Sequence, residues 1–129
     1  MRQADRGLAL NGSGALVDAV VEMARFDEAG LFERTRKIAD HWEQAAHALK
    51  GAPHVIDIRN IGLVAAIEFA PRPGGPGQRS AECAEACYQD GVLVRAGADL
   101  IVLSPPLTIE PDEIDRIFAS IRKALDTIA

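Results

Sequence analysis

Two neighbouring apolar segments, separated by a single short turn, constrain the fold of this chain more than any other feature. The first segment, residues 54–60, alternates apolar and polar side chains, as a half-buried strand does. The second, residues 63–69, reads LVAAIEF and is almost continuously apolar, which is typical of an interior strand. Because only Ile61 and Gly62 separate them, we expect a turn or bulge there and an antiparallel pair of strands.

Helical periodicity dominates most of the remaining chain. Six further elements are predicted: helices over residues 15–26, 31–49 and 80–90 and from Pro111 onward, and strands over residues 92–95 and 100–103. The resulting order interleaves helices and strands without regular alternation. It predicts the α+β class, with a small, mainly antiparallel sheet of about four strands packed against helices.

The length of 129 residues suits one domain, and a content of 48% apolar residues can fill its core. Residues 1–13 lack a clear period and end at an Asn-Gly-Ser turn signal, so we expect an irregular lead-in there and a single domain over residues 14–129. No apolar run approaches the roughly 20 residues of a membrane span, and no secretory leader is recognisable. These features favour a cytoplasmic protein.

The formal net charge of −5 argues against nucleic acid or an anionic membrane as a partner, although a local basic pocket for a small anion remains compatible with it. Cys83 and Cys87 are the only cysteines, too few for a disulfide scaffold or a metal site. Their spacing of four places both thiols on one face of a helix. We expect reduced, packed thiols.

The helix predicted over residues 15–26 is apolar around most of its circumference. Only Asp18, Glu22 and Arg25 interrupt it, and they fall on one narrow stripe. Such a helix is either largely buried or needs the surface of a partner.

No nucleophile and base stand together in the sequence. His41, His47 and His54 are scattered, and we expect them to be solvated or packed. Glu68 lies in an apolar strand, so its carboxylate is expected to be paired or exposed at the strand end. The segment PRPGGPG at residues 71–77 lacks the GK[ST] of a phosphate loop and loses N–H donors to proline, which indicates a plain connector.

Arg95 is the strongest candidate for a binding residue. It ends the apolar run VLVR and precedes the small residues of AGAD. A guanidinium held there can receive a carboxylate or a phosphate through bidentate hydrogen bonds. The alternative is a salt bridge to Asp99 across the following turn.

Several segments, in order, resemble the C-terminal small domain of class III pyridoxal-phosphate-dependent aminotransferases, most of all the omega-amino acid (beta-alanine)–pyruvate aminotransferases. They are GLFER, RNIGLVAAIEF, PRPGGPG, GVLVR and the LSPPL that leads into the last helix. The resemblance covers residues 15–129. It implies a domain that closes over the substrate and docks on a large domain or in a homo-oligomer. It also implies that Arg95 binds the carboxylate of a small amino or keto acid.

The resemblance places the imine-forming lysine in the large domain, upstream of every residue here. Lys37, Lys50 and Lys123 are the only lysines, and all are predicted at surface positions of helices. The threonine that holds the cofactor phosphate in the family has no counterpart in GLALNGSGAL, residues 7–16. We therefore expect no catalytic, cofactor-binding or metal-binding residue in this chain, with pyridoxal phosphate belonging to the full-length enzyme.

The chain alone is accordingly predicted to be inactive, as a truncated part of a transaminase. Two alternatives use the same scaffold. One is a module that binds small carboxylates through Arg95 without a cofactor. The other is a protein-interaction module that associates through its apolar first helix.

Overall fold

The computed structural model describes residues 13–28 and 30–129. The chain divides into two compact units, with the division between Arg34 and Thr35. Helix α2 (Ser13–Glu28) belongs to the first unit. The second unit contains the sheet and the helices that cover it, and it carries every candidate residue discussed below.

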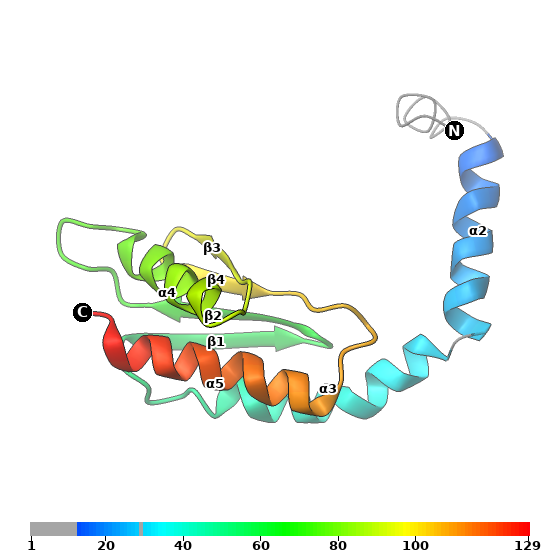
Figure 1. Ribbon diagram of the computed structural model, residues 1–129. Helices are drawn as coiled ribbons and strands as arrows, with labels where there is room; N and C mark the ends of the chain where they lie inside the picture. Colours follow the sequence, from blue (N-terminus) through cyan, green and yellow to red (C-terminus); the bar gives the residue numbers. More distant parts are fainter. Residues whose placement is uncertain (1–12, 29) are drawn as a thin grey trace. The chain divides into compact units, whose positions relative to one another are not determined.

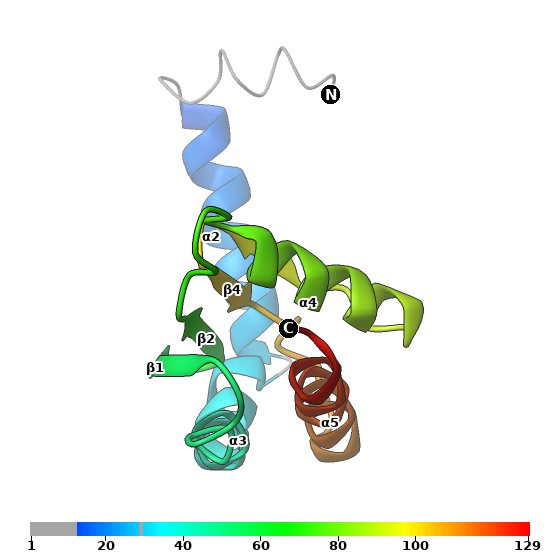
Figure 2. The same ribbon diagram turned by 90° about the vertical axis from the view of Figure 1, so that its left-hand side faces the viewer.

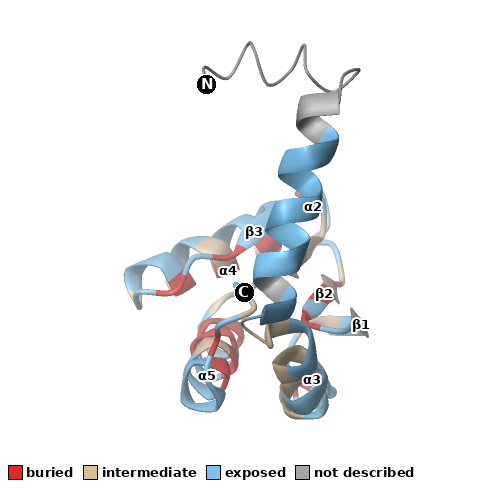
Figure 3. Ribbon diagram, turned by 90° about the vertical axis from the view of Figure 1, so that its right-hand side faces the viewer, coloured by how far each residue is buried: buried red, intermediate tan, exposed pale blue. Residues whose placement is uncertain are grey.

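Helix α2 exposes its apolar side chains (Figure 3). Leu16 and Val20 are 69% and 66% exposed, so burial, the first of the two alternatives for this helix, is wrong. A partner surface stays a prediction. The lead-in predicted for residues 1–13 lies outside the described residues except for Ser13, which begins α2. The single domain predicted from residue 14 onward stays a prediction.

A four-stranded antiparallel sheet forms the centre of the second unit (Figure 1). Its strands are β1 (Val55–Ile61), β2 (Val64–Phe69), β3 (Arg95–Gly97) and β4 (Leu100–Leu103). Their order across the sheet is β1-β2-β4-β3, so two hairpins meet at the central β2–β4 pair and β1 and β3 form the edges. The α+β class and the antiparallel pair around Gly62 are confirmed.

Helices α3 (Leu31–His47), α4 (Gln78–Gln89) and α5 (Pro111–Thr127) lie on the same side of the sheet (Figure 2). Alternation along β2 explains why: Ile67 and Phe69 point into the core, whereas Ala66 and Glu68 are only half-buried on the opposite face. The sheet therefore has a face covered by helices and an open face among the described residues.

The last helix begins where the sequence predicts. Pro111 occupies its first turn, and Glu110 and Glu113 form a capping box. Its apolar stripe packs into the core, where Phe118 meets Trp42 of α3 edge to face with ring centroids 5.0 Å apart.

The strand predicted over residues 92–95 is wrong in position, because β3 runs over Arg95–Gly97. Val92 donates its backbone N–H to the Cys87 carbonyl at 2.8 Å, so this segment wraps around the end of α4 and does not extend the β-ladder. Val92 and Val94 are nevertheless buried while Leu93 is 84% exposed. The alternation of residues 92–94 therefore reflects alternating burial of their side chains in a segment that does not pair as a strand.

Candidate functional site

Arg95 lies at the edge of the sheet, as the first residue of β3 and not at the end of a strand. Arg95 pairs with Val102 of β4, and Val102 lies opposite Ala66 of β2. Ala66 lies opposite Arg59 of β1, so the four residues form one row across the sheet. Because directly opposed residues in a ladder point to the same side, this row places Arg95 and Arg59 at the two ends of the open face.

A hollow of about 610 Å³ opens beside Arg95. Its lining comes from the segment before β3, from the end of β4 with the turn after it, and from one residue each of α3 and α5. These residues are Leu93, Val94, Val102–Pro106, Trp42 and Ile117. The hollow thus combines one guanidinium with mostly apolar walls, which suits a small ligand that has a carboxylate and an apolar portion.

Within the described part of the chain, Arg95 forms no ion pair and is exposed. The predicted alternative, a salt bridge to Asp99, is wrong. The Asp99 carboxylate accepts a hydrogen bond from the backbone N–H of Gly77 at 2.7 Å. The five donors of the Arg95 guanidinium are consequently available to an external acceptor.

The turn that follows β3 is fixed by the start of α4. The Ser80 hydroxyl, which is 1% exposed, hydrogen-bonds to the carbonyls of Gly77 and Ala98. Ala98 has φ = 49°, a left-handed conformation that is uncommon for a residue with a Cβ. The Asp99 carbonyl accepts from the N–H of Phe69 at 2.7 Å, so this turn is held from two sides.

At the opposite end of the row, Arg59 pairs with two carboxylates. Its Nη1 lies 2.8 Å from Glu68 Oε2 and 2.5 Å from Asp57 Oδ2. The hydrogen bonds that Arg59 donates, to Glu68 first and to Asp57 second, raise the pKa of Arg59 above its usual value. Of the two expectations for Glu68, pairing is confirmed, on a side chain that is partly exposed.

The three histidines have separate structural partners. His41 contacts Asp115 at 2.7 Å, His47 contacts Asn60 at 2.8 Å, and the ring of His54 lies 3.3 Å from the carbonyl of Ile128. None of them lines the hollow at Arg95. The expectation of solvated or packed histidines is confirmed.

Cys83 and Cys87 are buried, free thiols on α4. A hydrogen bond with Cys87, together with burial, raises the pKa of the Cys83 thiol. This favours packed, protonated sulfur at that position. No group of residues suited to hold a metal ion occurs in the part of the chain that the structure describes.

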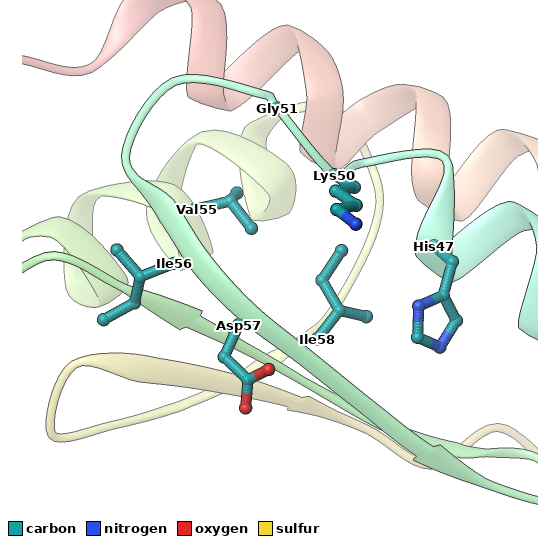
Figure 4. A pocket seen from close by; sticks show the side chains of 7 residues that line it. All are labelled: His47, Lys50, Gly51, Val55, Ile56, Asp57 and Ile58. Carbon is teal, nitrogen blue, oxygen red and sulfur yellow. The ribbon is translucent and has the colours of Figure 1, made fainter.

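A second hollow, of about 180 Å³, lies between the end of α3 and the first half of β1 (Figure 4). His47, Lys50 and Gly51 line one side, and Val55–Ile58 line the other. The sequence carries no signal for this hollow, because it exists only where the end of the helix meets the edge strand.

None of the three lysines fits the requirements of imine chemistry. A lysine that forms an imine needs an amine that is desolvated or next to another cation. Lys37 and Lys50 are exposed, and the exposed Lys123 forms an ion pair with Asp90 at 3.0 Å. None of the three lysines therefore has the desolvated or cation-flanked environment that this chemistry requires.

Comparison with known proteins decides the family. The profile of the family Aminotransferase class-III matches residues 13–125. The chain belongs to the class III aminotransferase family. Over 110 residues it is 46% identical to the omega-aminotransferase of Caulobacter vibrioides, and over 99 residues it is 41% identical to the beta-alanine–pyruvate aminotransferase of Pseudomonas aeruginosa. These alignments cover 85% and 77% of this chain.

The chain spans about a quarter of the length of these class III relatives, 25% and 22% respectively. Among solved structures, an aminotransferase from Vibrio fluvialis in its PMP-bound form matches with a TM-score of 0.69 and 27% identity, over 76% of this chain and 23% of that one. A transaminase with L-alanine matches with a TM-score of 0.76 over 84% of this chain and 27% of that chain, at 24% identity, which supports the fold alone.

The class III family depends on pyridoxal phosphate. The exposed lysines described above do not fit that cofactor, and no reaction step can be derived through it from this chain's residues. Between residues 13 and 129, leaving out residue 29, no helix has the length and apolarity needed to cross a bilayer.

Proposed function

We propose that this chain acts as the small domain of a class III aminotransferase and that Arg95 binds the carboxylate of a small amino or keto acid. One observation carries the proposal: among the residues that the structure describes, Arg95 has no carboxylate partner, although it stands beside an apolar hollow and on the same open face as Arg59, which pairs with two carboxylates. The domain contributes substrate binding and orientation, and the imine chemistry belongs to the part of the subunit that this chain does not include.

The substrate class follows from the chemistry of the hollow. A planar guanidinium forms two parallel hydrogen bonds with a carboxylate, which fixes both the position and the plane of the bound acid. The apolar walls from Leu93 and Pro106 leave little to satisfy a second charged group near Arg95. We therefore expect the amino or keto end of the substrate to point away from the domain.

The first experiment is a titration of the chain with pyruvate and with beta-alanine, followed through the Nε–Hε signals of its arginines by NMR. We expect a saturable shift at Arg95, which Arg95→Ala abolishes. Arg122→Ala is the matched control, since it removes an exposed guanidinium of α5 that pairs with Asp126. Unchanged binding by Arg95→Ala would contradict the role of Arg95.

The second experiment tests inactivity of the chain alone. Incubation with pyridoxal phosphate, borohydride reduction and mass spectrometry should give no stoichiometric adduct on a single lysine. Mixing with the remaining three quarters of the Caulobacter omega-aminotransferase should restore transfer of the amino group of beta-alanine to pyruvate. Transfer by the isolated chain would overturn the proposal.

A second candidate function is cofactor-free binding of small carboxylates by the isolated chain. The availability of the Arg95 guanidinium favours it, because nothing else in the chain is needed for that contact. Binding in the first experiment, combined with no restored transfer in the second, would select this function.

A further inference from the structure

We infer that Asp99 is a positioning residue for Arg95. The Asp99 carboxylate binds Gly77 and not Arg95, and this contact fixes the turn after β3. This inference rests on the proposed function, because it explains how the binding site at Arg95 is kept open. It also gives a role to the Gly- and Pro-rich segment at residues 71–77, which the sequence analysis interprets as a plain connector.

Asp99 is the natural competitor for Arg95. Arg95 begins β3 and Asp99 lies in the turn that follows it, so the two residues are four positions apart in one hairpin. An aspartate so near in sequence is a candidate for an ion pair with the arginine. A carboxylate bound there would occupy the donors that an external acid needs. The structure directs the Asp99 carboxylate to the N–H of Gly77 instead, at 2.7 Å.

Gly77 is suited to this contact in two ways. Its φ of 77° lies in the left-handed region that favours glycine, and a Cβ at this position would lie 3.3 Å from the carbonyl oxygen of Ala98. The end of the connector therefore approaches the turn after β3 more closely than most residues with a side chain could. Gly77 is also the N-cap of α4, and a carboxylate is favoured at the start of a helix.

The remaining contacts hold the same turn from the other directions. The buried hydroxyl of Ser80 bonds the carbonyl of Ala98, and the N–H of Phe69 bonds the carbonyl of Asp99. Three contacts to two adjacent residues leave the turn little freedom, and β3 is only three residues long. The turn therefore helps to fix the register of β3 against β4, and through that register the side of the sheet to which Arg95 projects.

The test compares Asp99→Ala with Asp99→Asn in the intact chain. The asparagine oxygen can still accept from Gly77, so Asp99→Asn should keep both the affinity for pyruvate and the amide exchange rates of β3. Asp99→Ala should weaken pyruvate binding about threefold to tenfold, because the competent orientation of Arg95 is populated less often, and should accelerate exchange in β3 but not in β1. Asp126→Ala, at an exposed carboxylate of α5, serves as the control.

Opposite results would overturn the inference. If both variants bind pyruvate more tightly, Asp99 competes for Arg95 in solution. If Asp99→Ala changes neither binding nor exchange in β3, the turn does not position the arginine. If Asp99→Ala fails to fold, Ser80→Ala removes one contact to the same turn and should show the same pattern of exchange.

The two proposals fail in different ways. A chain that binds no carboxylate refutes the role proposed for Arg95. The exchange of Ala96 and Gly97 still reports whether Asp99 fixes the turn, since that measurement needs no ligand.

Discussion

The two edges of the sheet carry the same side chain in opposite electrostatic states. At the β1 edge, Arg59 is held by Asp57 and Glu68. At the β3 edge, in the same row, Arg95 has no ion pair within the described residues, and its potential partner Asp99 is bonded to Gly77. Whether an arginine at the edge of this sheet forms ion pairs within the protein or is available to a ligand thus depends on which groups the neighbouring carboxylates contact.

The largest effect should come from removing the support that both edges share. Ile67 is fully buried in β2 and lies opposite Ile58 and Ile101. Ile67→Ala should lower the free energy of unfolding by about 2–5 kcal/mol through lost burial and a cavity. Urea unfolding measures it, and Val64→Ala, at a partly exposed site on the same strand, should cost less than about 1 kcal/mol. Equal losses in the two variants would show that the sheet's helix-covered face is not the core.

The next largest effect should be a loss of stability that is confined to the β3 edge and leaves the β1 edge unchanged. Ser80→Ala leaves the carbonyl of Ala98 without its buried donor and should cost about 1–3 kcal/mol. Amide exchange should accelerate in β3 while β1 stays protected. Thr127→Ala removes a hydroxyl bond at the exposed end of α5 and should change stability by about 0.5 kcal/mol or less. Uniform acceleration in β1 and β3 would contradict a local role.

A third prediction is that Arg59 at the β1 edge can be made available to a ligand, as Arg95 is at the β3 edge. The double substitution Asp57→Asn and Glu68→Gln keeps the side-chain shapes but removes both charges that hold Arg59. Arg59 should then become a second receptor for pyruvate, with a saturable shift of its Nε–Hε signal in the NMR titration. Stability should change little, because this ion-pair cluster is exposed. A silent Arg59 signal would show that availability alone does not make a receptor and that the apolar hollow at Arg95 is required.

The smallest expected effect is on the pKa of Glu82, which pairs with a third arginine, Arg72. Bidentate hydrogen bonds from Arg72 lower the pKa of Glu82 below its usual value. The folded-state pKa is depressed, so the pair stabilises the protein above the unfolded-state pKa and the contribution is lost as the pH falls through the folded-state pKa. A carboxyl-carbon NMR titration should show the low pKa for Glu82, and Arg72→Gln should raise it. No change in that variant would show that pairing with Arg72 does not determine the titration.

Local chemistry made most of the fold predictable. Alternation in residues 54–60, the Gly62 turn and Pro111 at a helix start each depend on residues close in sequence, and each is confirmed. The strand predicted over residues 92–95 was wrong, because buried alternation also arises when a segment wraps the end of a helix.

The site was predictable only in part. Arg95 stood out because a cation follows an apolar run and precedes small residues, and its place beside a hollow agrees with that interpretation. The partner of Asp99 could not be predicted, since Gly77 reaches it from 22 positions away through the packing of α4 on the sheet. The same limit applies to Arg59, whose second carboxylate comes from the neighbouring strand.

The contact between α3 and α5 has a consequence for the order of events during synthesis. His41 and Asp115 meet across 74 positions of sequence, and next to them Trp42 receives the ring of Phe118. The ring of Phe118 can cover the tryptophan only after the last helix has left the ribosome. The second unit therefore completes its core after translation of α5, and a nascent chain that stalls before Pro111 lacks this cover on its largest aromatic side chain.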